Sequence, residues 1–208
     1  MAGATVTAAS SREAPVAGVV LAAGSSSRLG SNKLLLEIGG EPLVRRAARR
    51  ALEAGLSPVI VVLGFEADEV AAALDGLDLT GVVCRDHTAG MHASMRAGLL
   101  RVPPECGAAV LLLADMPLVT SAMTAAVVRR YRTGSEPLVI SLYGGAQAPP
   151  TLYARALFPA LLAVEAGGGR GVVRDHRHQA AELDWPPARL ADLDRAEDVA
   201  RVRALAVE

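Results

Sequence analysis

Aromatic side chains are scarce in this chain of 208 residues, which holds one Trp, three Tyr and two Phe. Hydrophobic residues still make up 51% of it, chiefly as Ala, Val and Leu, beside 21% charged residues. This composition favours helices packed on a buried sheet over a β-sandwich. The length and apolar content suit one domain with a substantial core.

Cysteine is also rare: Cys84 and Cys106 stand alone, with no His or Cys nearby at the spacing of metal ligands. We expect free thiols in a reducing, cytoplasmic setting. No apolar run approaches the roughly 20 residues of a membrane-spanning helix, and the N-terminal segment lacks the pattern of a signal peptide. We therefore expect no membrane contact. We also expect a disordered tail over residues 1–14 and a single domain over 15–208.

Long runs of one charge are absent, and the formal net charge is −1. The densest basic cluster consists of Arg45, Arg46, Arg49 and Arg50, which have the spacing of one helix face. This pattern predicts a solvated helix face and not a nucleic-acid footprint. We expect no nucleic-acid partner.

Short apolar runs alternate with helical patterns along the chain. Strands are expected over 16–22, 58–64, 80–84, 108–116, 137–143 and 149–153. Helices are expected over 41–55, 66–74, 90–102, 120–134 and 156–169, the last broken by Pro159. Near the end, Asp194 stands three residues before Glu197, a capping-box pattern that predicts a final amphipathic helix. The alternation predicts an α/β fold: a three-layer, Rossmann-like domain with a mostly parallel sheet.

Two segments at the ends of predicted strands carry the chemistry, because ligands of parallel sheets bind outside the carboxyl ends of the strands. The loop after the first strand, LAAGSSSRLGSNKLL, contains Gly24, Arg28 and Lys33. A glycine-rich loop offers backbone N–H groups to phosphates, and the cations add charge. Asp115 ends a very apolar run and is the oxygen ligand that Mg²⁺ prefers. The set suits phosphoryl transfer.

Two familiar phosphate loops are excluded. The spacing from Gly24 through Gly30 to Lys33 does not fit the Walker pattern, and Ser26 stands where a dinucleotide-binding loop needs its second glycine. Simpler alternatives remain for both segments. The loop can be an ordinary, though long, connection between a strand and a helix, and Asp115 can be a turn residue before Met-Pro.

Four patterns together resemble the MobA-like nucleotidyltransferases: LAAGSSSRLGSNKLLL, LLADMP, GMHASMRAG and DLDRAED. The resemblance covers roughly residues 16–202 and is closest to the molybdenum cofactor cytidylyltransferases. It implies the fold of the nucleotide-diphospho-sugar transferases. It also implies an EC 2.7.7-type enzyme that transfers NMP from a nucleoside triphosphate to a phosphorylated acceptor and releases pyrophosphate.

The same resemblance implies the residues of the site. It assigns catalytic roles to Arg28, Lys33 and Asp115, with Asp115 also as the ligand of an Mg²⁺ cofactor. The implied nucleotide-binding residues are Leu21, Ala22, Ala23, Gly24, Ser25, Ser26, Lys33, Gly90 and Ser94. In this family LAAG, as opposed to LAGG, goes with cytidine, so the expected donor is CTP. The expected acceptor is molybdopterin, a pterin phosphate, with a molybdoenzyme as client partner.

The far half of the chain departs from the family pattern. Ala148 stands where relatives carry a glycine, Gly169 where they carry an aspartate, and Val173 where they carry an arginine. Arg170, Arg174 and Asp175 lie close in sequence and are candidate substitutes. Two alternatives therefore stay open. The acceptor can be a sugar or alditol phosphate, or the chain can be a non-catalytic nucleotide-binding accessory protein for molybdoenzyme maturation.

The remaining distinctive side chains have simpler interpretations. His92, in GMHAS, would face the predicted nucleotide pocket, with ligand contact as the lesser alternative. His176 and His178 indicate a polar helix end and not a metal pair. Trp185 precedes two prolines and is expected to pack beneath a loop.

Overall fold

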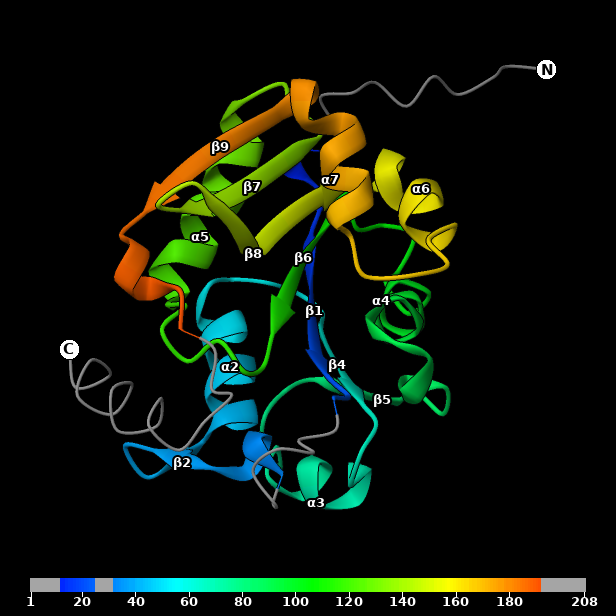
Figure 1. The fold of residues 1–208 in the computed structure, drawn as a ribbon, viewed down its shortest axis with the longest axis vertical. Coiled ribbons are helices and arrows are strands. Elements are labelled where there is room, and N and C mark those ends of the chain that lie inside the picture. Colours follow the sequence, from blue (N-terminus) through cyan, green and yellow to red (C-terminus); the bar gives the residue numbers. More distant parts are fainter. Residues whose placement is uncertain (1–11, 25–31, 192–208) are drawn as a thin grey trace.

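A seven-stranded sheet forms the centre of the molecule in the computed structural model, which describes residues 12–24 and 32–191 (Figure 1). The strands lie in the order β5-β4-β1-β6-β8-β7-β9. They are β1 (Val16–Ala22), β4 (Val59–Leu63), β5 (Thr80–Val83), β6 (Ala108–Leu113), β7 (Leu138–Tyr143), β8 (Ala146–Ala154) and β9 (Ala180–Trp185). All neighbours pair in parallel except β8, which runs antiparallel to β6 and β7. A separate small hairpin pairs β2 (Glu37–Ile38) with β3 (Glu41–Pro42).

The helices largely follow the predicted pattern. They are α2 (Leu43–Glu53), α3 (Ala67–Ala72), α4 (Met91–Leu99), α5 (Ser121–Thr133), α6 (Phe158–Leu162) and α7 (Arg170–His176). Short 3-10 turns complete the connections: η1 (Lys33–Leu35), η2 (His87–Ala89), η3 (Arg155–Leu157), η4 (Arg177–Gln179) and η5 (Pro187–Arg189). The start of α5 follows from its cap, because the Thr120 side chain accepts a hydrogen bond from the Met123 N–H at 3.2 Å.

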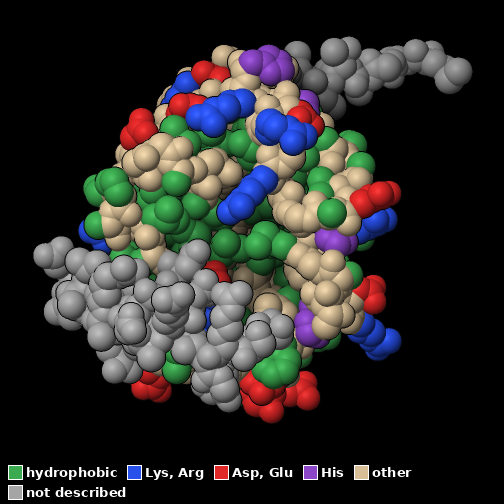
Figure 2. Space-filling model, in the orientation of Figure 1, with side chains coloured by type: hydrophobic (Ala, Val, Ile, Leu, Met, Phe, Trp, Pro, Cys, Tyr) green, Lys and Arg blue, Asp and Glu red, His purple; other side chains and the backbone are tan. Residues whose placement is uncertain are grey.

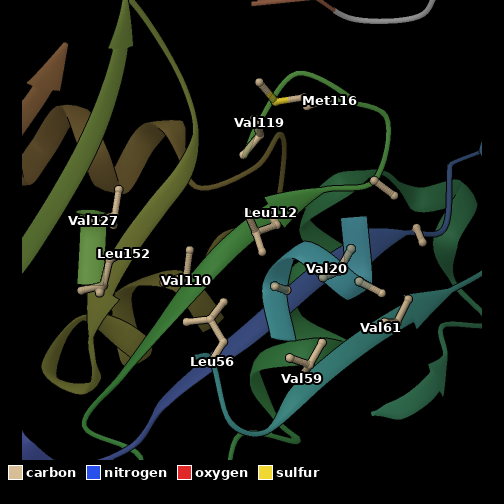
Figure 3. Packing of buried hydrophobic residues seen from close by; sticks show 14 of the residues in the cluster. Val20, Leu56, Val59, Val61, Val110, Leu112, Met116, Val119, Val127 and Leu152 are labelled. Atoms are coloured by element: carbon tan, nitrogen blue, oxygen red, sulfur yellow. The ribbon is translucent and has the colours of Figure 1, made fainter. Parts of the chain in front are cut away.

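Alternate side chains of the central strands face opposite sides of the sheet, and this divides the core in two. Val20, Val61 and Val110 pack on the side covered by α2 and α5 (Figure 3). Val19 and Ile60 pack on the other side, where α4, α6 and α7 lie (Figure 1). Strands buried on both faces need the continuous apolar runs seen in the sequence. The predicted three-layer α/β fold with a mostly parallel sheet is confirmed.

Two local expectations were incomplete or wrong. β9 was not predicted, because this edge strand is half exposed and has no continuous apolar run. The predicted helix over 156–169 is α-helical only over 158–162, and Pro159 does not break it: it lies in the first turn of α6, where a missing N–H breaks no helical hydrogen bond. Trp185 ends β9 and packs partly buried against the core, and its expected place beneath a loop stays a prediction.

The prediction of a solvated arginine face on α2 is wrong in part. Arg46 is buried, and Arg49 forms a two-pronged ion pair with Glu41, with both N–O distances 2.8 Å. Arg45 and Arg50 each donate to two backbone carbonyl oxygens of neighbouring loops. The aliphatic stems of arginine pack along apolar surface while the guanidinium finds polar partners. Helical spacing alone does not reveal this.

Several predictions fall outside the described residues, or on their border. Ser25, Ser26 and Arg28 lie outside them, as do the Asp194–Glu197 capping box and residues 1–11 of the predicted tail. Arg12 belongs to the described part and lies over the Tyr131 ring, 4.7 Å from its centre. The division at residue 14 stays a prediction. Both cysteines are buried and free, as expected. Among the described helices, none has the length and apolarity to cross a membrane.

Candidate functional site

The loops that follow β1 and β6 emerge side by side at one edge of the sheet. Leu21 pairs with Leu113 near the carboxyl ends of these parallel strands. Beyond the paired region, the Ala114 N–H donates to the Leu21 carbonyl at 3.1 Å. The glycine-rich loop and Asp115 are therefore held at neighbouring positions, where ligands of parallel sheets bind.

Lys33 and Asp115 form an ion pair across these two loops, with 2.7 Å between Nζ and Oδ2. Lys33 begins η1, a turn capped by Asn32, whose side chain accepts from the Leu34 N–H at 3.1 Å. The two charged side chains are 16% and 26% exposed, so both are partly desolvated while still open to a ligand. A primary ammonium and a carboxylate thus meet at the end of the glycine-rich loop.

The pair lines a cavity of about 310 Å³, which we call the loop cavity. Seven of the predicted site residues line it: Leu21, Ala23, Gly24, Lys33, Gly90, Ser94 and Asp115. The structure thus brings together residues that lie far apart in the sequence. The Ala22 side chain instead points into the core. Its predicted role, a backbone contact with nucleotide, stays a prediction, as do the roles of Ser25, Ser26 and Arg28.

Gly90 shapes the far wall of the loop cavity. It precedes α4 with φ 123° and ψ 178°, a backbone conformation that is essentially restricted to glycine. One turn into α4, the buried Ser94 lines the cavity. His87 also lines it, from η2, whereas His92 is not among the lining residues. His92 therefore does not line the cavity as expected, and His87 was not identified from the sequence because it belongs to a turn that has no periodic signal.

A second cavity of about 270 Å³ adjoins the first, and we call it the apolar cavity. Leu21, Met91 and Leu113 line both cavities and so form their shared wall. The other lining residues are Met95, Leu111, Gln147, Ala148, Pro149, Thr151, Tyr153, Gly167, Gly168, Gly169 and Arg170. Ala148, Gly169 and Arg170 were named from the sequence, as departures from the family pattern or as a candidate substitute, and the other residues were not assigned to the site. They come from the half of the fold where the family pattern fades, or from the interior of a strand or helix.

The walls of the apolar cavity contain few polar groups. The Gln147 amide donates to the Thr151 hydroxyl at 3.2 Å, so these two side chains partly satisfy each other. Arg170 is exposed and has no ion-pair partner within residues 12–24 and 32–191. Figure 2 shows hydrophobic side chains in the middle of this face, with basic side chains gathered over the region of α7 and β9. The cavity offers apolar walls and one cation that forms no ion pair with the part of the chain that the structure describes.

Tyr153 leaves no space for a side chain at residue 169. A Cβ atom at Gly169 would overlap the Tyr153 hydroxyl oxygen and lie 3.2 Å from Cζ of the ring. The hydroxyl donates a long hydrogen bond of 3.4 Å to the Gly169 carbonyl. Burial raises the pKa of Tyr153 far above neutral pH, so the hydroxyl keeps its proton. A neutral phenol occupies the space that an aspartate side chain would need.

The side chains of the loop cavity fit a divalent ion only when a substrate supplies the remaining ligands. No group of three or more His, Cys, Asp and Glu side chains within the described chain is placed to hold a metal. Among residues 12–24 and 32–191, Asp115 is the one carboxylate that lines the loop cavity. Mg²⁺ commonly binds through one or two carboxylates, with phosphate and water oxygens completing its shell. Asp115 therefore fits an ion that arrives with a triphosphate.

Known proteins resemble this chain in sequence and in fold. The Bifunctional protein GlmU of Anaeromyxobacter sp. strain Fw109-5 is 40% identical over 122 residues, 55% of this chain and 24% of that protein. The curated relatives are matched over only 13% to 36% of their length. Rv0371c from Mycobacterium tuberculosis H37Rv is 29% identical with a TM-score of 0.80, covering 94% of this chain and 99% of that one. Rv0371c is also known in complex with manganese.

A further structure shares the fold alone. Molybdopterin-guanine dinucleotide biosynthesis protein A from Archaeoglobus fulgidus has a TM-score of 0.64 at 14% identity, covering 92% of this chain and 99% of that one. The MobA-like NTP transferase domain matches residues 18–181, a range that includes Lys33, Asp115 and the walls of both cavities. The chain belongs to the family of MobA-like NTP transferase domains, with a nucleotidyltransferase-type function and the nucleotide-diphospho-sugar transferase fold.

Proposed function

We propose that this chain transfers CMP from CTP to molybdopterin and releases pyrophosphate. The observation that carries the proposal is the Lys33–Asp115 pair, 2.7 Å apart, in a cavity that shares a wall with a second one. A transfer between two substrates requires two adjoining sites, because holding both reactants in line supplies much of the rate enhancement.

The loop cavity is the proposed donor site. Backbone N–H groups around Gly24 and the Lys33 ammonium face the triphosphate, and Arg28 adds a second cation from the same loop. Ser94 and Gly90 line the nucleoside side. Lys33 neutralises charge on the phosphates and on the leaving pyrophosphate. The preference for CTP rests on the resemblance of LAAG to the cytidine-specific pattern.

Asp115 is the proposed ligand of a divalent ion, which we expect to be Mg²⁺. When bound, such an ion neutralises phosphate charge and polarises the α-phosphate. The manganese complex of Rv0371c supports a divalent ion in a protein of similar sequence and fold. The carboxylate and the Lys33 ammonium are then both available to the triphosphate, one through the ion and one directly.

The apolar cavity is the proposed acceptor site. A sugar or alditol phosphate carries many hydroxyl groups, which would need polar partners when buried. Few such groups are available, because Gln147 and Thr151 already bond to each other. A flat heterocycle with a phosphate end matches better: Met91, Met95 and Leu111 contact the rings, and Arg170 attracts the anionic end. These features favour the pterin phosphate over the sugar phosphate.

The reaction needs little covalent work from the protein. An oxygen of the acceptor phosphate attacks the α-phosphorus of CTP, and the bond from that phosphorus to the bridging oxygen breaks. Pyrophosphate leaves with the electron pair of that bond. Positioning and charge stabilisation then account for the catalysis.

Pyrophosphate release tests the proposal. The purified protein with Mg²⁺ is assayed with CTP, GTP, ATP or UTP against molybdopterin, a sugar phosphate and an alditol phosphate. We expect turnover that requires both CTP and molybdopterin. Turnover with a sugar or alditol phosphate alone would refute the acceptor assignment. Nucleotide binding in calorimetry without turnover on any acceptor would identify a binding protein and refute catalysis.

A further inference from the structure

Arg50 fixes the segment that follows Asp115, although it lines neither cavity. It lies on α2, next to the last residues of β6. Its Nη1 donates to the Pro117 carbonyl at 2.6 Å and to the Val119 carbonyl at 2.7 Å. One guanidinium nitrogen thus joins two carbonyls that lie two and four residues beyond the carboxylate. Arg50 has no ion-pair partner in the described part of the chain.

The segment around Asp115 is held on both sides. Before it, the Ala114 N–H donates to β1. After it, Met116 and Val119 are buried in the core on the same side as Leu112 (Figure 3). Val119 also donates through its N–H to the Met116 carbonyl at 3.2 Å. Arg50 satisfies the two carbonyls that turn back toward α2, so the carboxylate extends from a backbone fixed at both ends.

Arg50 keeps its positive charge although its surroundings disfavour that charge. Burial, followed by repulsion from Arg46 and Arg49, lowers the pKa of Arg50 to about 10. The guanidinium is still charged at neutral pH, but a partly buried cation that forms no ion pair within the described residues is unfavourable. An apolar side chain would avoid this penalty in a wall made of Leu112, Met116 and Val119. What it could not provide is a donor that fixes two carbonyls.

We infer that Arg50 is a positioning residue for Asp115. By fixing residues 117 and 119, it holds the carboxylate at the orientation in which it meets Lys33 and faces the loop cavity. The inference rests on the proposed function, because it assumes that Asp115 holds the ion. Groups that orient a metal ligand typically change metal affinity or activity by about 10- to 100-fold when removed.

Arg45 provides a matched control. It lies on the same helix, and its Nη1 also donates to two carbonyls, Ala73 at 3.1 Å and Asp75 at 2.8 Å. Those carbonyls follow α3, and neither residue lines the two cavities. Arg45→Met and Arg50→Met therefore remove the same charge and the same number of carbonyl contacts. Only Arg50→Met releases the segment beyond Asp115.

Two measurements separate positioning from general destabilisation. The first is amide hydrogen exchange over residues 114–120 without nucleotide or metal, which we expect to quicken in Arg50→Met and not in Arg45→Met. The second is Mn²⁺ affinity in the presence of CTP and without acceptor, followed by electron paramagnetic resonance. We expect about 10-fold weaker binding in Arg50→Met and wild-type binding in Arg45→Met.

Equal effects of the two variants in both measurements would overturn the inference. Failure of the wild type to bind Mn²⁺ with CTP would refute the proposed function instead, while the exchange comparison would still test how Arg50 holds the segment. If Arg50→Met does not fold, Arg50→Lys and Arg45→Lys form the second pair. We expect faster exchange in Arg50→Lys alone, because an ammonium on a shorter stem cannot hold both carbonyls, and equal exchange would again overturn the inference.

Discussion

The Tyr153 hydroxyl occupies the space that a side chain at residue 169 would need. The two residues lie 16 positions apart in sequence, one on β8 and the other just before α7, and the hydroxyl donates to the Gly169 carbonyl. Tyr153 is buried in the core and its ring cannot move away cheaply. Residues 153 and 169 are therefore sterically coupled, and a neutral donor stands at the wall of the apolar cavity.

Gly169→Ala tests this pairing. We expect a lower melting temperature and a higher KM for the acceptor, because the new Cβ overlaps the phenol. Tyr153→Phe in the same chain should recover part of the loss by removing the hydroxyl. Gly171→Ala is the control, since a Cβ there meets no atom within 4 Å, and alanine favours the helix. Equal melting temperatures for the two alanine variants would contradict the steric account.

Lys33→Ala and Asp115→Ala should each reduce turnover by about 100-fold or more, the scale of losing one charge-stabilising group. Their melting temperatures should change little, because the pair is partly exposed. Arg177→Ala removes an exposed ion pair with Glu182, 2.9 Å long, whose two residues line neither cavity, and should leave turnover unchanged. Wild-type turnover in the Lys33 or Asp115 variant would remove that residue from the mechanism.

Arg170→Ala should raise the KM for the acceptor by about 10-fold, equivalent to about 1.4 kcal/mol, with the KM for CTP unchanged. The reason is the position of its uncompensated charge at the apolar cavity and not at the loop cavity. Arg174→Ala is the matched control on the same helix, since Arg174 is 80% exposed and pairs with Asp175. Steady-state kinetics with each substrate varied in turn measures both constants. A rise in the KM for CTP alone would reverse the assignment of the cavities.

Glu41→Gln should flatten the acid dependence of stability. The hydrogen bonds from Arg49 hold the pKa of Glu41 below its usual value of 4.5. A carboxylate with a lowered folded-state pKa contributes stability that is present above 4.5 and is lost as the pH falls through its folded pKa. Melting temperatures from pH 6 to pH 3 should therefore fall less steeply in Glu41→Gln than in wild type. Parallel curves would mean that the ion pair does not persist in solution.

The central strands and the loop-cavity side of the site were predictable because the apolar runs in the sequence agree with the positions of the strands in the sheet. Val59–Leu63 and Ala108–Leu113 are apolar along their whole length, and only a strand covered on both faces needs this. Parallel strands then bring their carboxyl ends to one edge. That rule alone places Gly24 beside Asp115, which the structure does through the contact of Ala114 with Leu21.

The rest depends on contacts that no spacing encodes. His87 lies in a turn, β9 is a half-exposed edge strand, and the overlap between Tyr153 and Gly169 is set by tertiary packing. Arg50 has the periodicity of an exposed helix position, yet its guanidinium reaches back to the segment beyond Asp115. Long, flexible side chains such as arginine allow both outcomes from the same helical position.

The reversed direction of β8 has a consequence for how the enzyme can change. Because β8 runs against β6, the beginning of β8 reaches the ligand edge, and Gln147 and Thr151 join the site there. Arg170 follows later still, so Gln147, Thr151 and Arg170, which line the apolar cavity, all come after residue 146, whereas Lys33 and Asp115 come before it. Substitutions in the later part of the chain can therefore reshape the apolar cavity while the Lys33–Asp115 pair is inherited intact.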